Sequence, residues 1–199
     1  MIEVPALVGY FPKQCEVPAG WRTAAATSHV TEICSISGCI ASSPDGWIDH
    51  WLHNDWGFFN APSDAGRVVP SGSTGFVIFA YRLLPLQFEG GETKPIGLGD
   101  LAVEPLPADF QSLGFDVVSR SISAFFECSP LSCNYMANEI PVNRHCLIDD
   151  LDQAVKVAER FSREQPEPGT YFVLEVLRAK QTQMEETLYI KVERFGWRS

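Results

Sequence analysis

Residues 149–177 read DDLDQAVKVAERFSREQPEPGTYFVLEVL, and this stretch contains the clearest helix and the clearest strand of the chain. Asp149 and Asp150 open it with negative charge, which stabilises the N-terminal end of a helix. Apolar residues then recur at helical spacing, at Leu151, Ala154, Val155, Val157, Ala158 and Phe161. Pro166 and Pro168 end this pattern, and the aromatic and β-branched run 171–177 follows. The stretch therefore predicts an amphipathic helix followed by a strand.

Other segments add strands and one more helix. Strand-like composition occurs at 6–11, 75–84, 112–119 and 188–195. Gly90-Gly91 predicts a hairpin turn, and the proline-rich stretch 95–107 predicts a loop. Segment 43–54 has a serine cap, a proline at the first helical position and an apolar stripe, so it predicts a short helix.

These elements predict an α+β fold, with a mixed, mainly antiparallel sheet packed against two or three helices. The 199 residues suit a single globular unit spanning 1–199. Because 45% of the residues are hydrophobic and 13 are Phe, the chain has ample apolar surface to bury, which excludes disorder of the whole chain.

The formal net charge is −10, and no run of Lys or Arg offsets it. This charge argues against a nucleic-acid partner, because a phosphate backbone would be repelled. The negative charge would favour binding to a basic protein partner. The alternative is that the acidic surface only keeps the protein soluble.

The first ten residues lack a basic region and are interrupted by Glu3 and Pro5, so they do not resemble a secretory signal. No segment is long and apolar enough to span a bilayer. We therefore expect no membrane association, a cytoplasmic location, and six cysteines present as thiols.

The two halves of the chain share an order of features, which suggests an internal duplication. The spacing of Cys34 and Cys39 matches that of Cys128 and Cys133, and segment 54–60 resembles 143–149. The alternative is coincidence, because exact identities are few. The related halves would be residues 1–104 and 105–199.

The paired cysteines are the first candidate site. Cys34, Cys39, Cys128 and Cys133 could bind zinc tetrahedrally if the two loops meet, because thiolates are soft donors. Structural zinc sites usually place two residues between paired ligands rather than four, so the alternative is that these cysteines pack as small buried residues.

A thiol nucleophile is the second candidate. Cys128 follows Glu127, and a histidine such as His145 could lower the pKa of the thiol if the fold brought them together.

A third candidate is a metal site at His50 and His53, which share one face of the helix at 43–54. The alternative is that the two histidines are partly exposed at the edge of the apolar stripe and bind no metal, which is more common than a metal site.

Surplus aromatic residues suggest a binding surface at Trp47, Trp51, Trp56 and Phe58. Burial of these side chains in the core is the favoured alternative.

The chain lacks a phosphate-binding loop, a nucleophile elbow and a dinucleotide fingerprint. We therefore expect a non-catalytic acidic protein that binds or regulates a protein partner. The alternatives are a thiol- or zinc-dependent enzyme with a site between the halves, and a small-molecule binding module.

Overall fold

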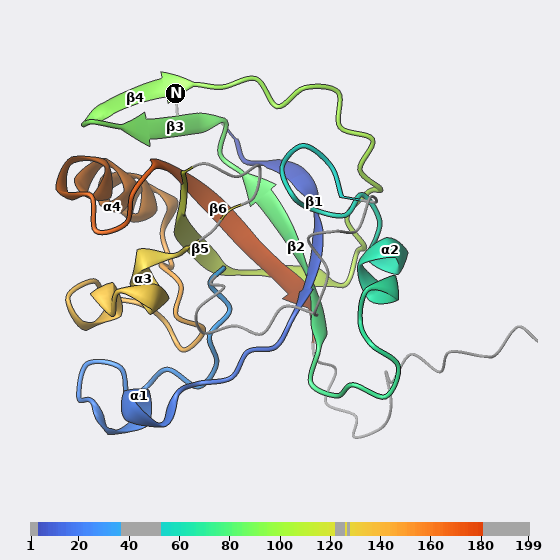
Figure 1. The fold of residues 1–199 in the computed structure, drawn as a ribbon, viewed down its shortest axis with the longest axis horizontal. Helices are drawn as coiled ribbons and strands as arrows, with labels where there is room; N and C mark the ends of the chain where they lie inside the picture. The colour runs from blue at the N-terminus through green and yellow to red at the C-terminus, as the bar shows by residue number, and fades with distance from the viewer. Residues whose placement is uncertain (1–3, 37–52, 122–125, 127, 181–199) are drawn as a thin grey trace, which may run out of the picture.

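The computed structural model describes residues 4–36, 53–121, 126 and 128–180 (Figure 1). Most of the helix predicted at 43–54, and the whole strand predicted at 188–195, lie outside these residues. Within them, a six-stranded antiparallel sheet packs with helices, which confirms the predicted α+β fold.

Four strands form the main body of the sheet in the order β1–β2–β6–β5, and each neighbouring pair is antiparallel. Their bounds are β1 Ala6–Lys13, β2 Val77–Leu83, β5 Phe110–Arg120 and β6 Thr170–Ala179. The hairpin of β3 (Leu86–Glu89) and β4 (Glu92–Pro95) joins the same edge of β6 beyond β2, where Phe88 lies opposite Tyr171. The predicted hairpin turn is confirmed, since Gly90 and Gly91 connect β3 to β4 with positive φ angles of 57° and 83°.

The helices of the described residues are short except for one. They are α1 Ala19–Thr23, α2 Pro62–Arg67, α3 Pro130–Cys133, the 3-10 helix Met136–Asn138 and α4 Leu151–Glu164. The side chain of Asp150 caps α4 by accepting a hydrogen bond from the Gln153 backbone N–H, at 2.9 Å. Helix α4 packs against β5, β6 and β3, whereas α2 packs against β1 and β2 (Figure 1).

The centre of the sheet is arranged symmetrically. Gly9 of β1 lies opposite Tyr81 of β2, and Gly114 of β5 lies opposite Val176 of β6. Tyr81 and Val176 in turn lie opposite each other. The register shifts next to Gly9 in one outer strand and next to Gly114 in the other. The outer strands therefore flank the inner pair in the same register.

An asparagine-centred turn braces β1. Asn54 Nδ2 donates to the Val8 carbonyl at 2.9 Å, while its Oδ1 accepts from the backbone N–H groups of Trp56 (3.0 Å) and Phe58 (3.3 Å). Side-chain hydrogen bonds of this kind fix a turn without help from secondary structure.

The same arrangement braces β5. Asn143 Nδ2 donates to the Leu113 carbonyl at 2.8 Å, and its Oδ1 accepts from the backbone N–H groups of His145 (2.8 Å) and Leu147 (3.3 Å). A left-handed residue follows in each turn, Gly57 (φ 80°) in one and Cys146 (φ 58°) in the other. The duplication of 1–104 and 105–199 stays a prediction about origin, and these matching turns support it.

Replacing either asparagine with alanine should destabilise the fold by about 2–4 kcal/mol, because each substitution leaves backbone groups without their hydrogen-bond partners. Urea unfolding of Asn54→Ala and Asn143→Ala would measure the loss. Asn138→Ala, at an exposed position, is the matched control and should change stability by less than about 0.5 kcal/mol. If Asn54→Ala or Asn143→Ala were as stable as this control, the asparagine side chain at that position would not stabilise the fold.

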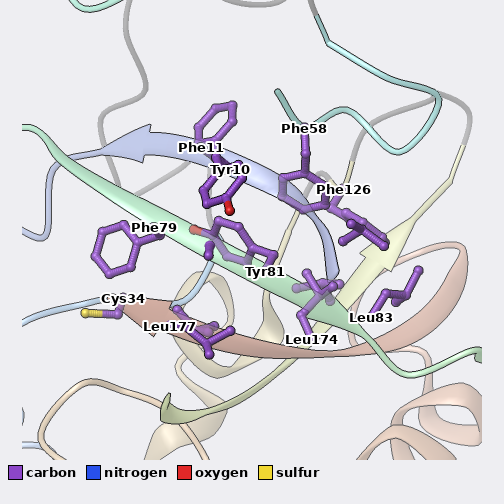
Figure 2. Packing of buried hydrophobic residues seen from close by; sticks show 14 of the residues in the cluster. Tyr10, Phe11, Cys34, Phe58, Phe79, Tyr81, Leu83, Phe126, Leu174 and Leu177 are labelled. Atoms are coloured by element: carbon purple, nitrogen blue, oxygen red, sulfur yellow. The ribbon is translucent and has the colours of Figure 1, made fainter. Parts of the chain in front are cut away.

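Within the part of the chain that the structure describes, one buried apolar cluster lies around β1, β2 and β6 (Figure 2). Phe58, which follows the first asparagine turn, stacks on Tyr81 with ring centroids 4.8 Å apart. The other cluster lies between α4 and the sheet and includes Phe88, Phe161 and Tyr171. None of the helices in the described ranges combines the length and the apolarity needed to cross a bilayer.

Candidate functional site

Five polar residues gather where the end of β1, the loop 32–36 and the end of β6 meet. They are Lys13, Cys15, Glu32, Cys34 and Arg178, and we call them the thiol cluster. Lys13 and Arg178 are buried although both are cationic, with 2% and 7% of their surfaces exposed. Lys13 Nζ and Arg178 Cζ lie 6.0 and 5.8 Å from the centroid of the Phe79 ring. A buried charge requires a compensating partner, so this cluster is the most informative polar feature of the described chain.

Both halves of the chain hold the loop that carries Glu32 and Cys34. On one side, the Ile33 N–H donates to the Cys15 carbonyl at 3.4 Å. On the other, the Cys34 N–H donates to the His145 carbonyl at 3.0 Å, and the Glu32 N–H donates to the Arg144 carbonyl at 3.2 Å. The loop therefore rests on the asparagine turn of the second half.

The two sulfurs of the cluster are adjacent. Cys34 Sγ donates a hydrogen bond to Cys15 Sγ at 3.8 Å. This hydrogen bond lowers the pKa of the Cys15 thiol, and the charges of Lys13 and Arg178 lower it further, against the effect of burial. The same hydrogen bond and burial raise the pKa of Cys34. Cys15 is partly exposed and Cys34 is buried, so the more acidic thiol is the more accessible one.

Glu32 is held by three hydrogen bonds. Arg178 contacts both carboxylate oxygens, at 2.5 and 2.9 Å, and His145 Nδ1 lies 2.6 Å from Oε1. Burial raises the pKa of Glu32, but the hydrogen bonds and charge of Arg178 and His145 outweigh burial and leave it lowered. Burial lowers the pKa of His145 despite Glu32. A neutral imidazole that donates from Nδ1 and accepts at Nε2 from Arg144 Nε, at 3.2 Å, fits both results.

A second polar layer lies behind the sulfurs, around Asp116. Its carboxylate accepts hydrogen bonds from Ser129 Oγ and from the Ile36 N–H, both at 2.6 Å. Burial raises the pKa of Asp116 to about 7, and it lowers the pKa of Lys13. Lys13 Nζ donates to the Ser35 carbonyl. The loop 32–36 is thus fixed through its backbone by one buried carboxyl and one buried amine.

Ligand atoms of Cys15, Glu32 and Cys34 all lie within 4.8 Å of one another. Two thiols and a carboxylate are donors that suit a transition metal or zinc. The same two thiols can form a disulfide. The cluster therefore permits thiol chemistry or metal binding.

The predicted four-cysteine zinc site is not assembled among the described residues. Cys128 and Cys133 form a disulfide across α3, with Cα atoms 6.5 Å apart, and Cys34 lies beside Cys15 instead. Cys39 lies outside the described residues. The expectation of six thiols is wrong for Cys128 and Cys133, because the turn of α3 brings their Cα atoms within the range that a disulfide spans.

The predicted nucleophile is placed differently as well. In the disulfide, Cys128 has no thiolate to attack with, and both ring nitrogens of His145 contact other residues. Glu127 lies outside the described residues. His145 does contribute to a thiol-containing site, but by contacting Glu32.

The predicted aromatic surface is only partly described. Trp47 and Trp51 lie outside the described residues, as does His50 of the predicted histidine pair. Phe58 is 2% exposed and belongs to the core. Trp56 is partly buried, with Nε1 donating to the Leu98 carbonyl at 3.2 Å and its ring stacked on Phe126. His53 forms an isolated β-bridge with Phe59.

Sequence reasoning missed Lys13, Cys15, Glu32 and Arg178. One local signal was Lys13, a charged residue at the end of an apolar strand and two positions before a cysteine. Comparison of the chain with family models, curated proteins and solved structures gives no match.

Proposed function

We propose that the protein is a thiol-dependent redox protein in which Cys15 and Cys34 alternate between a dithiol and a disulfide. The observation that carries this proposal is the Cys34–Cys15 hydrogen bond, with 3.8 Å between the sulfurs and opposite shifts of the two pKa values. The proposal keeps the predicted thiol-dependent enzyme with a site between the halves, but assigns it to different cysteines.

In this cycle the Cys15 thiolate attacks a disulfide of the substrate. A mixed disulfide with Cys15 forms, and the first substrate thiolate leaves and takes up a proton. Cys34 then loses its proton to solvent and attacks Cys15 Sγ, which releases the second substrate thiol. The substrate disulfide gains two electrons, and the protein dithiol loses two and becomes a disulfide.

The surroundings assign different roles to the two thiols. Lys13 and Arg178 favour the anionic form of Cys15, the partly exposed sulfur. Cys34 stays protonated while Cys15 is charged, because the neighbouring sulfur raises its pKa. Once Cys15 is in a mixed disulfide, that charge is gone and Cys34 becomes easier to ionise. The first attack is thus assigned to Cys15 and the second to Cys34.

The other functional hypotheses stay predictions. An acidic regulator of a basic protein partner would be tested by co-purification, and a cytoplasmic location by fractionation of cells. Of the four aromatic residues suggested as anchors, the two that are described are buried or partly buried. This burial favours the thiol cluster over an aromatic surface as the functional site.

Incubating the reduced full-length protein with glutathione disulfide should form a disulfide between Cys15 and Cys34, in addition to the one between Cys128 and Cys133. Alkylation and peptide mass spectrometry across a series of glutathione ratios would identify the bonded pair and its midpoint. Cys34→Ser should stop at a mixed disulfide of Cys15 with glutathione, because the second attacking sulfur is missing.

Cys146→Ser is the matched control, because Cys146 is a buried cysteine whose pKa burial raises to about 12. This variant should form the Cys15–Cys34 disulfide like the original protein. Absence of a Cys15–Cys34 disulfide at every glutathione ratio, with the protein folded, would rule out the proposed function.

A further inference from the structure

The thiol cluster has a second capacity that does not depend on the redox cycle. We infer that, when both thiols are reduced, Cys15, Cys34 and Glu32 bind one zinc ion or a similar soft divalent metal ion. The ligands are the two sulfurs and one carboxylate oxygen, which leaves a fourth position for water or another ligand.

The spacing of the sulfurs fits this ion. Zinc–sulfur bonds of about 2.3 Å at a tetrahedral angle place two sulfur ligands about 3.8 Å apart. Cys15 Sγ and Cys34 Sγ are 3.8 Å apart. An oxygen of Glu32 lies within 4.8 Å of both sulfurs, so the three ligand atoms are close enough together to surround one ion.

Charge balance also permits the ion, despite two nearby cations. Arg178 is paired with Glu32, and Asp116 lies near enough to Lys13 to oppose the effect of burial on its pKa. Zinc that displaces one proton from each thiol leaves the net charge of the cluster unchanged. A buried site tolerates such an exchange far better than the addition of an isolated charge.

Hydrogen bonds hold the Glu32 carboxylate beside the two sulfurs. Arg178 and the Nδ1–H of His145 fix Glu32, in the way that hydrogen bonds from neighbouring groups usually orient metal ligands. The Glu32 side chain keeps 22% of its surface exposed, and Cys15 is partly exposed, so an ion can enter from solvent.

Titration of the reduced, metal-free, full-length protein with Co²⁺ under argon tests the site. One equivalent should produce thiolate-to-cobalt charge-transfer absorption, and Zn²⁺ should displace the cobalt. Cys15→Ser and Cys34→Ser should each weaken binding by at least about a hundredfold, while Glu32→Gln should weaken it by about ten- to hundredfold.

Cys146→Ser should bind like the original protein, and circular dichroism of each variant would show that it is folded. Charge-transfer absorption that persists in both Cys15→Ser and Cys34→Ser, or absence of a one-equivalent end point in the original protein, would overturn the inference. Because the titration contains no oxidant, its outcome is separate from that of the glutathione experiment.

Discussion

Asp116→Ala should lower the free energy of unfolding by about 3–5 kcal/mol, because it removes one partner from a buried group of charged and polar residues. Asp116 is fully buried, and its carboxylate accepts hydrogen bonds from Ser129 Oγ and the Ile36 N–H. The substitution leaves both donors unsatisfied and removes one of the negative charges that act on Lys13. Urea unfolding at pH 7 would measure the loss.

Asp116→Asn is the matched control, because asparagine has nearly the same shape as aspartate but does not titrate. The difference between the two proteins should therefore depend on pH. The pKa of Asp116 is about 7 in the folded protein, compared with 3.8 for the unperturbed group. Between these values the folded state binds more protons than the unfolded state, so this group makes stability fall as pH rises from about 4 to 7. Lys13, whose pKa is lowered, acts in the opposite direction at higher pH.

Both Asp116→Asn and Asp116→Ala should therefore flatten the decline in stability between pH 4 and 7, and Asp116→Ala should in addition lower the whole profile. Urea midpoints at several pH values would separate these effects. Parallel profiles for the original protein and Asp116→Asn would contradict the assigned pKa.

Gly9→Ala and Gly114→Ala should each destabilise the protein by about 3–5 kcal/mol, the sum of backbone strain and steric overlap. Gly9 has a φ of +141°, and an added Cβ would lie 2.6 Å from the Phe59 carbonyl oxygen. Gly114 has a φ of +132°, and its Cβ would lie 2.8 Å from the Ile148 carbonyl oxygen. In both places the obstacle is backbone, which cannot move aside without breaking the β-bridge next to it.

Gly97→Ala is the control, because an added Cβ at this position meets nothing within 4 Å. Thermal or urea unfolding should show a change of less than about 0.5 kcal/mol for the control. Equal stability of Gly9→Ala and Gly97→Ala would show that the backbone around Gly9 adapts at little cost.

The regular elements could be predicted because their apolar spacing is local. The α4 pattern and the 171–177 run identify a helix and a strand without reference to the rest of the chain. The first strand was predicted to stop before Pro12, yet β1 continues to Lys13. β1 is at the edge of the sheet, where a residue without an N–H is tolerated, and sequence alone does not show which strand is the edge.

The thiol cluster could not be predicted in the same way, because its members come from segments far apart in the sequence, including the ends of two strands and the irregular loop 32–36. Cys15 and Cys34 are 19 residues apart, and Arg178 reaches Glu32 from 146 positions away. The regular Cys-x4-Cys spacing instead indicated Cys128 and Cys133, which do pair, but as a disulfide. The segments 54–60 and 143–149 were recognised as similar from the sequence, but the asparagine turns that they form were not predicted.

The position of β6 has a consequence for biosynthesis. This strand lies between β5 on one side and β2 and β3 on the other, yet it is the last described strand to leave the ribosome. Until it emerges, the nascent chain holds β2 and β5 with unpaired backbone edges, which can associate with other chains. Completion of the sheet therefore has to wait until translation has passed β6, and chaperones would have their largest effect in that interval.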